Sequence, residues 1–169
     1  MKIMRDFRMA TYKVALVSDW YYPKAGGIEY SINSLARNLC LLGHDVHIVT
    51  RSAKAYNETE LREGIPVTRL AGAGIGGRLI SPRAFAALRR HLITSDYDVI
   101  HVHGLDSPMA MAALFFARQA RLPTVTTNHS LVGNISIRRP VLSVCRFMLK
   151  ASDVVIAVSS AVKKESRLI

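Results

Sequence analysis

The chain has 169 residues, half of them hydrophobic, and a formal charge of +11 at pH 7 with an isoelectric point near 10.2. These values exclude a disordered chain, fit one domain with its own core, and favour an anionic partner such as nucleic acid, anionic lipid or a phosphorylated ligand. The two cysteines, Cys40 and Cys145, stand far apart in apolar patterns, which excludes a disulfide framework and favours a cytoplasmic location.

Strands and helices alternate after a basic N-terminal extension at residues 1–11. In chain order, the pattern predicts a strand at 12–18, a helix at 28–42, strands at 45–50 and 65–71, a helix at 82–94, a strand at 98–104, a helix at 107–121, a strand at 123–129, a helix at 139–151, a strand at 153–159 and a last helix from 160. Residues 55–64 are predicted to be a polar connection, and 72–80 a mobile glycine-rich loop. Apolar, β-branched strands separated by helices predict an α/β fold, a Rossmann-like parallel sheet with helices on both faces.

The stretch PKAGGIEY, residues 23–30, joins the first strand to the first helix without a side chain that would cap the helix. Gly26 and Gly27 occupy the place where Ser, Thr, Asp or Asn usually stands. Helix N-termini attract phosphate through their N–H groups and the helix dipole, and glycine lets a diphosphate approach the backbone. The loop is therefore a candidate phosphate site, although it lacks the GxGxxG pattern and a plain glycine turn is the alternative.

Polar side chains follow several of the predicted strands. In a parallel α/β sheet, ligands bind beyond the carboxyl ends of the strands, at the point where the strand order reverses. The residues at those ends are Ser18 and Asp19, His101 to Gly104, Asn128 to Ser130, and Ser159 and Ser160. His101 and His103 point to the same side of one strand, as metal ligands can, but two ligands are too few and we predict no metal site.

Four segments together resemble a known family: PKAGGIEYSINSLARNLCLLGHDVHIVT, DVIHVHG, TVTTNHS and DVVIAVSSAVKKE. They are similar to the N-terminal domain of the retaining glycosyltransferases of family four, which have the GT-B fold. The resemblance covers residues 12–169, and the segment TNHSLVGN is most similar to the branch of phosphatidylinositol N-acetylglucosaminyltransferase subunits and their microbial relatives. The resemblance implies two Rossmann-like domains with the active site between them.

In that family, the N-terminal domain holds the sugar acceptor and the C-terminal domain holds most of the nucleotide sugar, with a pair of glutamates eight positions apart. The resemblance therefore implies that 12–169 is the acceptor domain, one half of a GT-B fold. The sequence ends where the donor-binding domain would begin, so we expect little or no sugar transfer by this chain alone. The implied donor is a UDP- or GDP-linked sugar, which is a substrate, and no cofactor is implied.

The resemblance also assigns roles to residues at the strand ends. Gly26 and Gly27 would contact phosphate through backbone N–H groups, with Glu29 supporting their loop. His129 matches the family histidine beside the transferred sugar and would be catalytic, stabilising charge in an oxocarbenium-like state; the alternative is a loop histidine that binds a backbone carbonyl. The residues expected to line the acceptor site or the cleft are His103, Asn128, Ser130, Asp19 and Glu29.

The basic charge suggests contact with a membrane surface. On the predicted helix 139–151, the residues Arg139, Arg146 and Lys150 fall on one stripe, and Arg83 and Arg90 lie opposite the apolar face of helix 82–94. Basic stripes edged by apolar residues can dock on anionic lipid, so we expect a peripheral protein at the cytoplasmic membrane face with an anionic lipid acceptor. A solvated helix face is the alternative. The longest uncharged apolar run, 107–117, is about half the ~20 residues that span a bilayer.

Two functions of other classes remain as alternatives. A nucleotide-sugar epimerase of the same two-domain architecture would share the phosphate loop but would need acid and base carboxylates in the cleft. A noncatalytic nucleic-acid-binding module is suggested only by the charge, and the sequence has neither a recognition motif nor an aromatic platform for it. No nucleic-acid partner is therefore expected.

Overall fold

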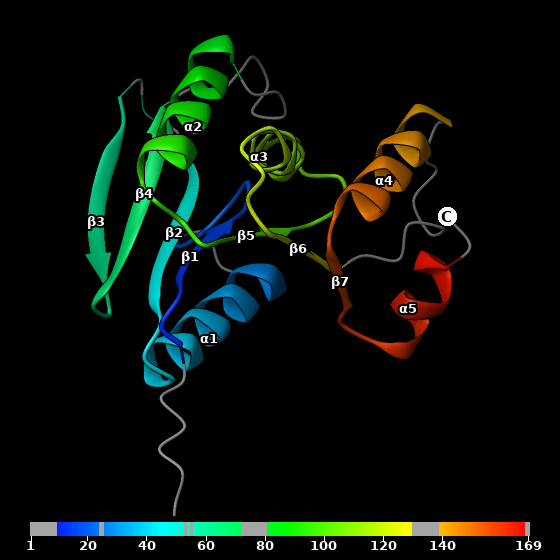
Figure 1. The fold of residues 1–169 in the computed structure, drawn as a ribbon, viewed down its shortest axis with the longest axis horizontal. Helices are drawn as coiled ribbons and strands as arrows, with labels where there is room; N and C mark the ends of the chain where they lie inside the picture. Colours follow the sequence, from blue (N-terminus) through cyan, green and yellow to red (C-terminus); the bar gives the residue numbers. More distant parts are fainter. Residues whose placement is uncertain are drawn as a thin grey trace, which may run out of the picture.

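The computed structural model describes residues 10–23, 26–52, 54, 56–71, 81–129 and 139–167. Its elements in chain order are β1 Lys13–Val17, α1 Gly27–Leu41, β2 Asp45–Ser52, β3 Glu58–Arg62, β4 Ile65–Ala71, α2 Pro82–Thr94, β5 Val99–His103, α3 Pro108–Gln119, β6 Thr124–Asn128, α4 Arg139–Ala151, β7 Val154–Ala157 and α5 Ser160–Ser166 (Figure 1). The predicted elements are all present, and most of their ends lie within two residues of the predicted ones.

The strands form one sheet with the order β3-β4-β2-β1-β5-β6-β7. From β1 the chain moves outward to β2 and β4, and it then returns to the other side of β1 to form β5. The strand order therefore reverses between β1 and β5, whose carboxyl ends lie side by side because Leu16 pairs with His101 and Val17 with Val102. A doubly wound sheet opens its ligand crevice at this place.

The strand β3 was not predicted, and it corrects the expectation of a purely parallel sheet. Residues 58–62 pair antiparallel with β4, and Arg62 stands opposite Ile65 across a two-residue turn. The turn is made by Glu63 and Gly64, both with positive φ (52° and 80°), as tight β-hairpins require. The segment looked like a loop because it is polar apart from Leu61, which is 75% exposed at this edge of the sheet.

Helices cover both faces of the sheet, which confirms the predicted α/β architecture. On one face, Ile32 and Ala36 of α1 pack against residues of the central strands such as Leu16 and Ile48. On the other face, α2, α3 and α4 lie side by side over residues such as Val17 and Val102 (Figure 1). Both cysteines are free, Cys145 in the core and Cys40 exposed.

Two helices on the second face start with the same pair of residues. Ser81 and Ser107 each precede a proline and each accept a hydrogen bond through Oγ, from the backbone N–H groups of Ala84 (3.1 Å) and Ala110 (3.0 Å). Such caps fix where a helix begins. The start of α3 is thereby held beside the ends of β1 and β5. Among the helices that the structure describes, none has the length and apolar character to cross a bilayer.

Candidate active site

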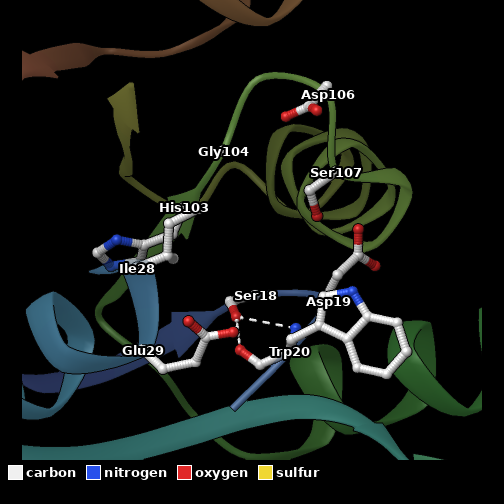
Figure 2. A pocket seen from close by; sticks show the side chains of 9 residues that line it. All are labelled: Ser18, Asp19, Trp20, Ile28, Glu29, His103, Gly104, Asp106 and Ser107. Atoms are coloured by element: carbon white, nitrogen blue, oxygen red, sulfur yellow. Dashed lines mark hydrogen bonds between the residues drawn. The ribbon is translucent and has the colours of Figure 1, made fainter. Parts of the chain in front are cut away.

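A pocket of about 180 Å³ lies at the point where the strand order reverses, and we name it the strand-end pocket. Its lining residues are Ser18, Asp19, Trp20, Ile28, Glu29, His103, Gly104, Asp106 and Ser107. Figure 2 shows that they come from the end of β1, the first turn of α1, and the segment between β5 and α3. The volume is below the roughly 300–1,000 Å³ of typical ligand pockets, so the pocket suits a single sugar- or polyol-sized group.

Asp19 connects three elements at this pocket. Its Oδ1 lies 3.0 Å from Nε of Arg51 at the end of β2 and accepts a hydrogen bond from the Met109 backbone N–H (3.3 Å) in the first turn of α3. Burial raises the pKa of the Asp19 carboxyl and outweighs the opposing attraction of Arg51. Asp19 lines the strand-end pocket, but its carboxylate is held mainly by Arg51 and the Met109 N–H.

The start of α1 is open on the side of the pocket. Gly26 is the N-cap, and no side chain of the described residues caps this end of the helix. A Cβ added to Gly27 would meet nothing within 4 Å, so packing within the described residues does not require glycine there. A Cβ on Gly26 would lie 2.6 Å from Oε2 of Glu29, a buried residue of the first turn, so the Glu29 carboxylate lies close against Gly26.

Three histidines stack across β5 and β6. The rings of His101 and His103 are 4.5 Å apart, those of His103 and His129 are 5.4 Å apart, and Nδ1 of His103 shares a hydrogen bond with Nε2 of His129 (3.1 Å). Nε2 of His103 is buried and has no hydrogen-bond partner within the described part of the chain. His103 also lines the strand-end pocket, so a hydroxyl group of a bound ligand is a candidate partner for this nitrogen.

Burial keeps these histidines neutral. It lowers the pKa of His101 to about 4, and burial together with the neighbouring histidines places the pKa of His103 well below its ordinary value. Burial also lowers the pKa of the half-buried His129. A neutral imidazole both donates and accepts one hydrogen bond, which suits the recognition of hydroxyl groups. Within the described ranges, no group of three or more His, Cys, Asp and Glu side chains is arranged to hold a metal ion.

Acidic pH is expected to destabilise the fold through this cluster. The pKa of His101 is about 4 in the folded chain against 6.5 ordinarily, so the unfolded chain binds the proton more tightly. Above pH 6.5, His101 is neutral in both states, and as the pH falls towards 4 the unfolded chain takes up a proton that the folded chain does not. The free energy of unfolding should therefore fall by about 2 kcal/mol between pH 7 and pH 5. Urea denaturation at both pH values measures it. His101→Gln should show a smaller loss; an identical loss would contradict the assignment.

The remaining predicted site residues lie in other surroundings. Asn128 is fully buried and donates a hydrogen bond from Nδ2 to Oγ of Ser166 (3.0 Å), so it joins β6 to α5 and does not line the strand-end pocket. Ser130 lies outside the described residues, as does the side chain of Arg139. The other predicted membrane-surface residues, Arg83, Arg90, Arg146 and Lys150, are exposed.

Sequence reasoning missed several residues of the site. Asp106, Ser107 and Trp20 line the strand-end pocket, and none of them was proposed. Ser107–Pro108 repeats the Ser–Pro helix start of residues 81–82, and this signal could have placed Ser107 at the mouth of the crevice. Trp20 directly follows Asp19 at the end of the first strand, so the strand-end rule could have included it.

The sequence and the fold of this chain both recur in known proteins. Residues 25–168 match Glycosyltransferase Family 4. The chain belongs to this family. It is 30% identical over 158 residues to the phosphatidylinositol N-acetylglucosaminyltransferase GPI3 subunit of Saccharomyces cerevisiae, a match that covers 90% of this chain and 35% of the relative. It is 35% identical over 133 residues to a subunit of the phosphatidylinositol N-acetylglucosaminyltransferase of Homo sapiens, a match that covers 75% of this chain and 27% of the relative.

This member of glycosyltransferase family 4 spans about a third of the length of those relatives. Its fold matches a crystal structure of Anabaena Alr3699/HepE in complex with UDP-glucose with a TM-score of 0.70 and 18% identity, over 93% of this chain and 40% of that one. The predicted family and the predicted Rossmann-like half of a GT-B fold are thereby confirmed.

Proposed function

We propose that this family 4 chain is the sugar-acceptor half of a retaining glycosyltransferase that uses a nucleotide sugar and a phosphatidylinositol head group. The observation that carries the proposal is the strand-end pocket, where hydroxyl, carboxylate and imidazole groups meet next to His129. The names of the relatives support N-acetylglucosamine as the sugar and phosphatidylinositol as the acceptor. UDP is favoured over GDP as the nucleotide, because a structural neighbour binds UDP-glucose.

The chemistry of the pocket suits a ring that carries several hydroxyl groups. Carboxylates such as Glu29 and Asp106 accept hydrogen bonds from hydroxyl groups, and the unpartnered Nε2 of His103 adds another polar contact. Trp20 and Ile28 offer apolar surface for the carbon–hydrogen faces of such a ring. An inositol ring bound here would present a hydroxyl group to the sugar donor.

The proposed donor lies between this pocket and the start of α1. The uncapped N-terminus of α1 attracts a diphosphate through its N–H groups and dipole, and the open space at Gly27 allows close approach. His129 then hydrogen-bonds the transferred sugar and stabilises positive charge as the bond to the diphosphate breaks. Because the relatives are named as transferases, transfer is favoured over epimerisation.

The proposed chemistry requires a donor-binding domain in addition to this chain. A direct test is transfer of radiolabelled N-acetylglucosamine from UDP-N-acetylglucosamine to phosphatidylinositol, measured with the chain alone and with the chain joined to a family 4 donor-binding domain. We expect transfer only in the joined protein. Transfer by the joined protein to sugar acceptors of another class, and not to phosphatidylinositol, would contradict the proposed acceptor.

Membrane docking through α2 and α4 is part of the proposal. Figure 1 shows these helices on the same side of the sheet, and Arg83, Arg90, Arg146 and Lys150 are exposed on them. Cations near an anionic surface contribute about 1 kcal/mol each, so we expect stronger co-sedimentation with anionic than with neutral vesicles, weakened by salt. Replacing Arg146 and Lys150 by glutamate should reduce it. Equal binding to both kinds of vesicle would leave these residues as a solvated face.

A further inference from the structure

A second and larger pocket lies next to the strand-end pocket. It has a volume of about 550 Å³ and lies between the β3–β4 hairpin, the end of β2 and the segment that follows β1; we name it the hairpin pocket. Its lining residues are Trp20, Tyr21, Pro23, Arg51, Ser52, Lys54, Glu58, Glu60, Arg62 and Arg69. Trp20 lines both pockets, so the two spaces adjoin at this side chain.

Arg51 is the most unusual residue of the hairpin pocket. Its side chain is only 4% exposed, and its guanidinium lies over the Trp20 ring at 4.7 Å while Nε faces Asp19 at 3.0 Å. Its Nη1 is buried and has no hydrogen-bond partner among the described residues. Buried guanidinium N–H groups are strong donors that proteins rarely leave unsatisfied, so this nitrogen calls for an acceptor beyond the described residues, such as a bound anion.

The ion pairs of the described residues leave Arg62 without a carboxylate partner, whereas Arg51 is paired with Asp19 through Nε and keeps Nη1 unpaired. Glu60 accepts a hydrogen bond from Nη2 of Arg69 (2.7 Å), and Glu58 pairs with Lys54 (2.6 Å), so both carboxylates are occupied. The guanidinium of Arg62 lies over the Tyr22 ring at 4.3 Å, and its Nε is buried without a hydrogen-bond partner within the described ranges.

We propose that the hairpin pocket binds the phosphate ester of the acceptor substrate, with Arg51 and Arg62 as its hydrogen-bond donors. The planar guanidinium of arginine can donate two parallel hydrogen bonds to phosphate oxygens. It is also less strongly hydrated than the ammonium group of lysine, which suits a buried anion site. The proposal rests on the proposed function, since the adjoining strand-end pocket would hold the hydroxyl-bearing ring. The ring and its phosphate would thus lie on either side of the Trp20 side chain. The basic hairpin pocket thereby selects acceptors that carry an anionic group.

The single tryptophan of the chain provides a direct measurement. Trp20 fluorescence is titrated with inositol 1-phosphate, inositol and inorganic phosphate at constant ionic strength. We expect saturable binding of inositol 1-phosphate, tighter than that of either other compound. Arg51→Gln and Arg62→Gln should each weaken it by roughly tenfold or more, the effect of one lost hydrogen bond to a charged group. The control Arg89→Gln removes the same charge from an exposed position of α2 and should leave binding unchanged.

Two results would overturn the proposal. One is that Arg51→Gln and Arg62→Gln leave the binding of inositol 1-phosphate intact. The other is that inorganic phosphate binds as tightly as inositol 1-phosphate. Arg62→Gln keeps the test decisive if Arg51→Gln unfolds, which thermal melting would reveal. The measurement needs no sugar transfer. If inositol 1-phosphate binds in an arginine-dependent way but no sugar is transferred to phosphatidylinositol, the proposed function is rejected and the anion site is kept. If sugar is transferred but binding does not depend on these arginines, the anion site is rejected and the proposed function is kept.

Discussion

Replacing His129 by alanine is expected to lower the rate of sugar transfer about ten- to a thousandfold in an enzyme that contains this chain and a donor-binding domain. The half-buried ring lies at the end of β6, hydrogen-bonded to His103, and burial lowers its pKa, so it is neutral near pH 7. Its loss removes one hydrogen bond to the transferred sugar in the transition state. Initial rates of radiolabel transfer measure the effect, and circular dichroism verifies the fold.

His91→Ala is a matched control for this experiment. His91 is also partly buried and hydrogen-bonded, through Nε2 to the Tyr97 hydroxyl (2.9 Å), but it lies on α2 and lines neither pocket. This variant should keep its transfer rate even if its melting temperature falls. Near-normal transfer by His129→Ala would contradict the catalytic assignment and leave His129 as a partner of His103.

Replacing Asp19 by alanine is expected to lower the free energy of unfolding by about 3–5 kcal/mol. The change would leave the Arg51 guanidinium, whose side chain is 4% exposed, buried without its carboxylate partner. It would also remove the acceptor of the Met109 N–H at the start of α3. Although burial raises the pKa of Asp19, the cost of an uncompensated buried arginine dominates. Urea denaturation followed by circular dichroism measures the change.

The exposed ion pair between α1 and the β3–β4 turn provides the comparison for this loss of stability. Arg37 and Glu63 are 3.5 Å apart, and their side chains are 63% and 46% exposed. Exposed pairs contribute at most about 1 kcal/mol, so Arg37→Ala should have a small effect. If Asp19→Ala destabilised the chain no more than Arg37→Ala does, the buried pair would not hold β1, β2 and α3 together as inferred.

Most of the fold could be predicted because its central strands are buried on both faces. The segment VALV at 14–17 is apolar throughout and VIHV at 99–102 is apolar except for His101, which distinguishes both from surface elements. The strand β3 could not be recognised in the same way, since ETELR is polar and pairs only at the edge of the sheet. Its turn, Glu63–Gly64, was the available signal.

From the sequence, only those residues of the site that directly follow a predicted strand could be predicted. That rule placed Asp19 and His103 near one crevice, and the structure brings both into the strand-end pocket. It could not foresee the hydrogen bond between His103 and His129, which depends on the register of β5 and β6. Nor could it foresee the hairpin pocket, because the guanidinium of Arg51 is positioned by Asp19 and Trp20 from another strand end.

The central claim is that the strand-end pocket binds the hydroxyl-bearing ring of the acceptor beside His103 and His129. Imidazole ¹H–¹⁵N correlation spectra of the chain, recorded during titration with inositol, test it most directly. The chain has six histidines, of which His101, His103 and His129 form the cluster and His44, His47 and His91 lie elsewhere and serve as internal controls. We expect saturable shifts for His103 and His129 and none for the controls. Unchanged cluster signals, or equal shifts of all six, would contradict the claim.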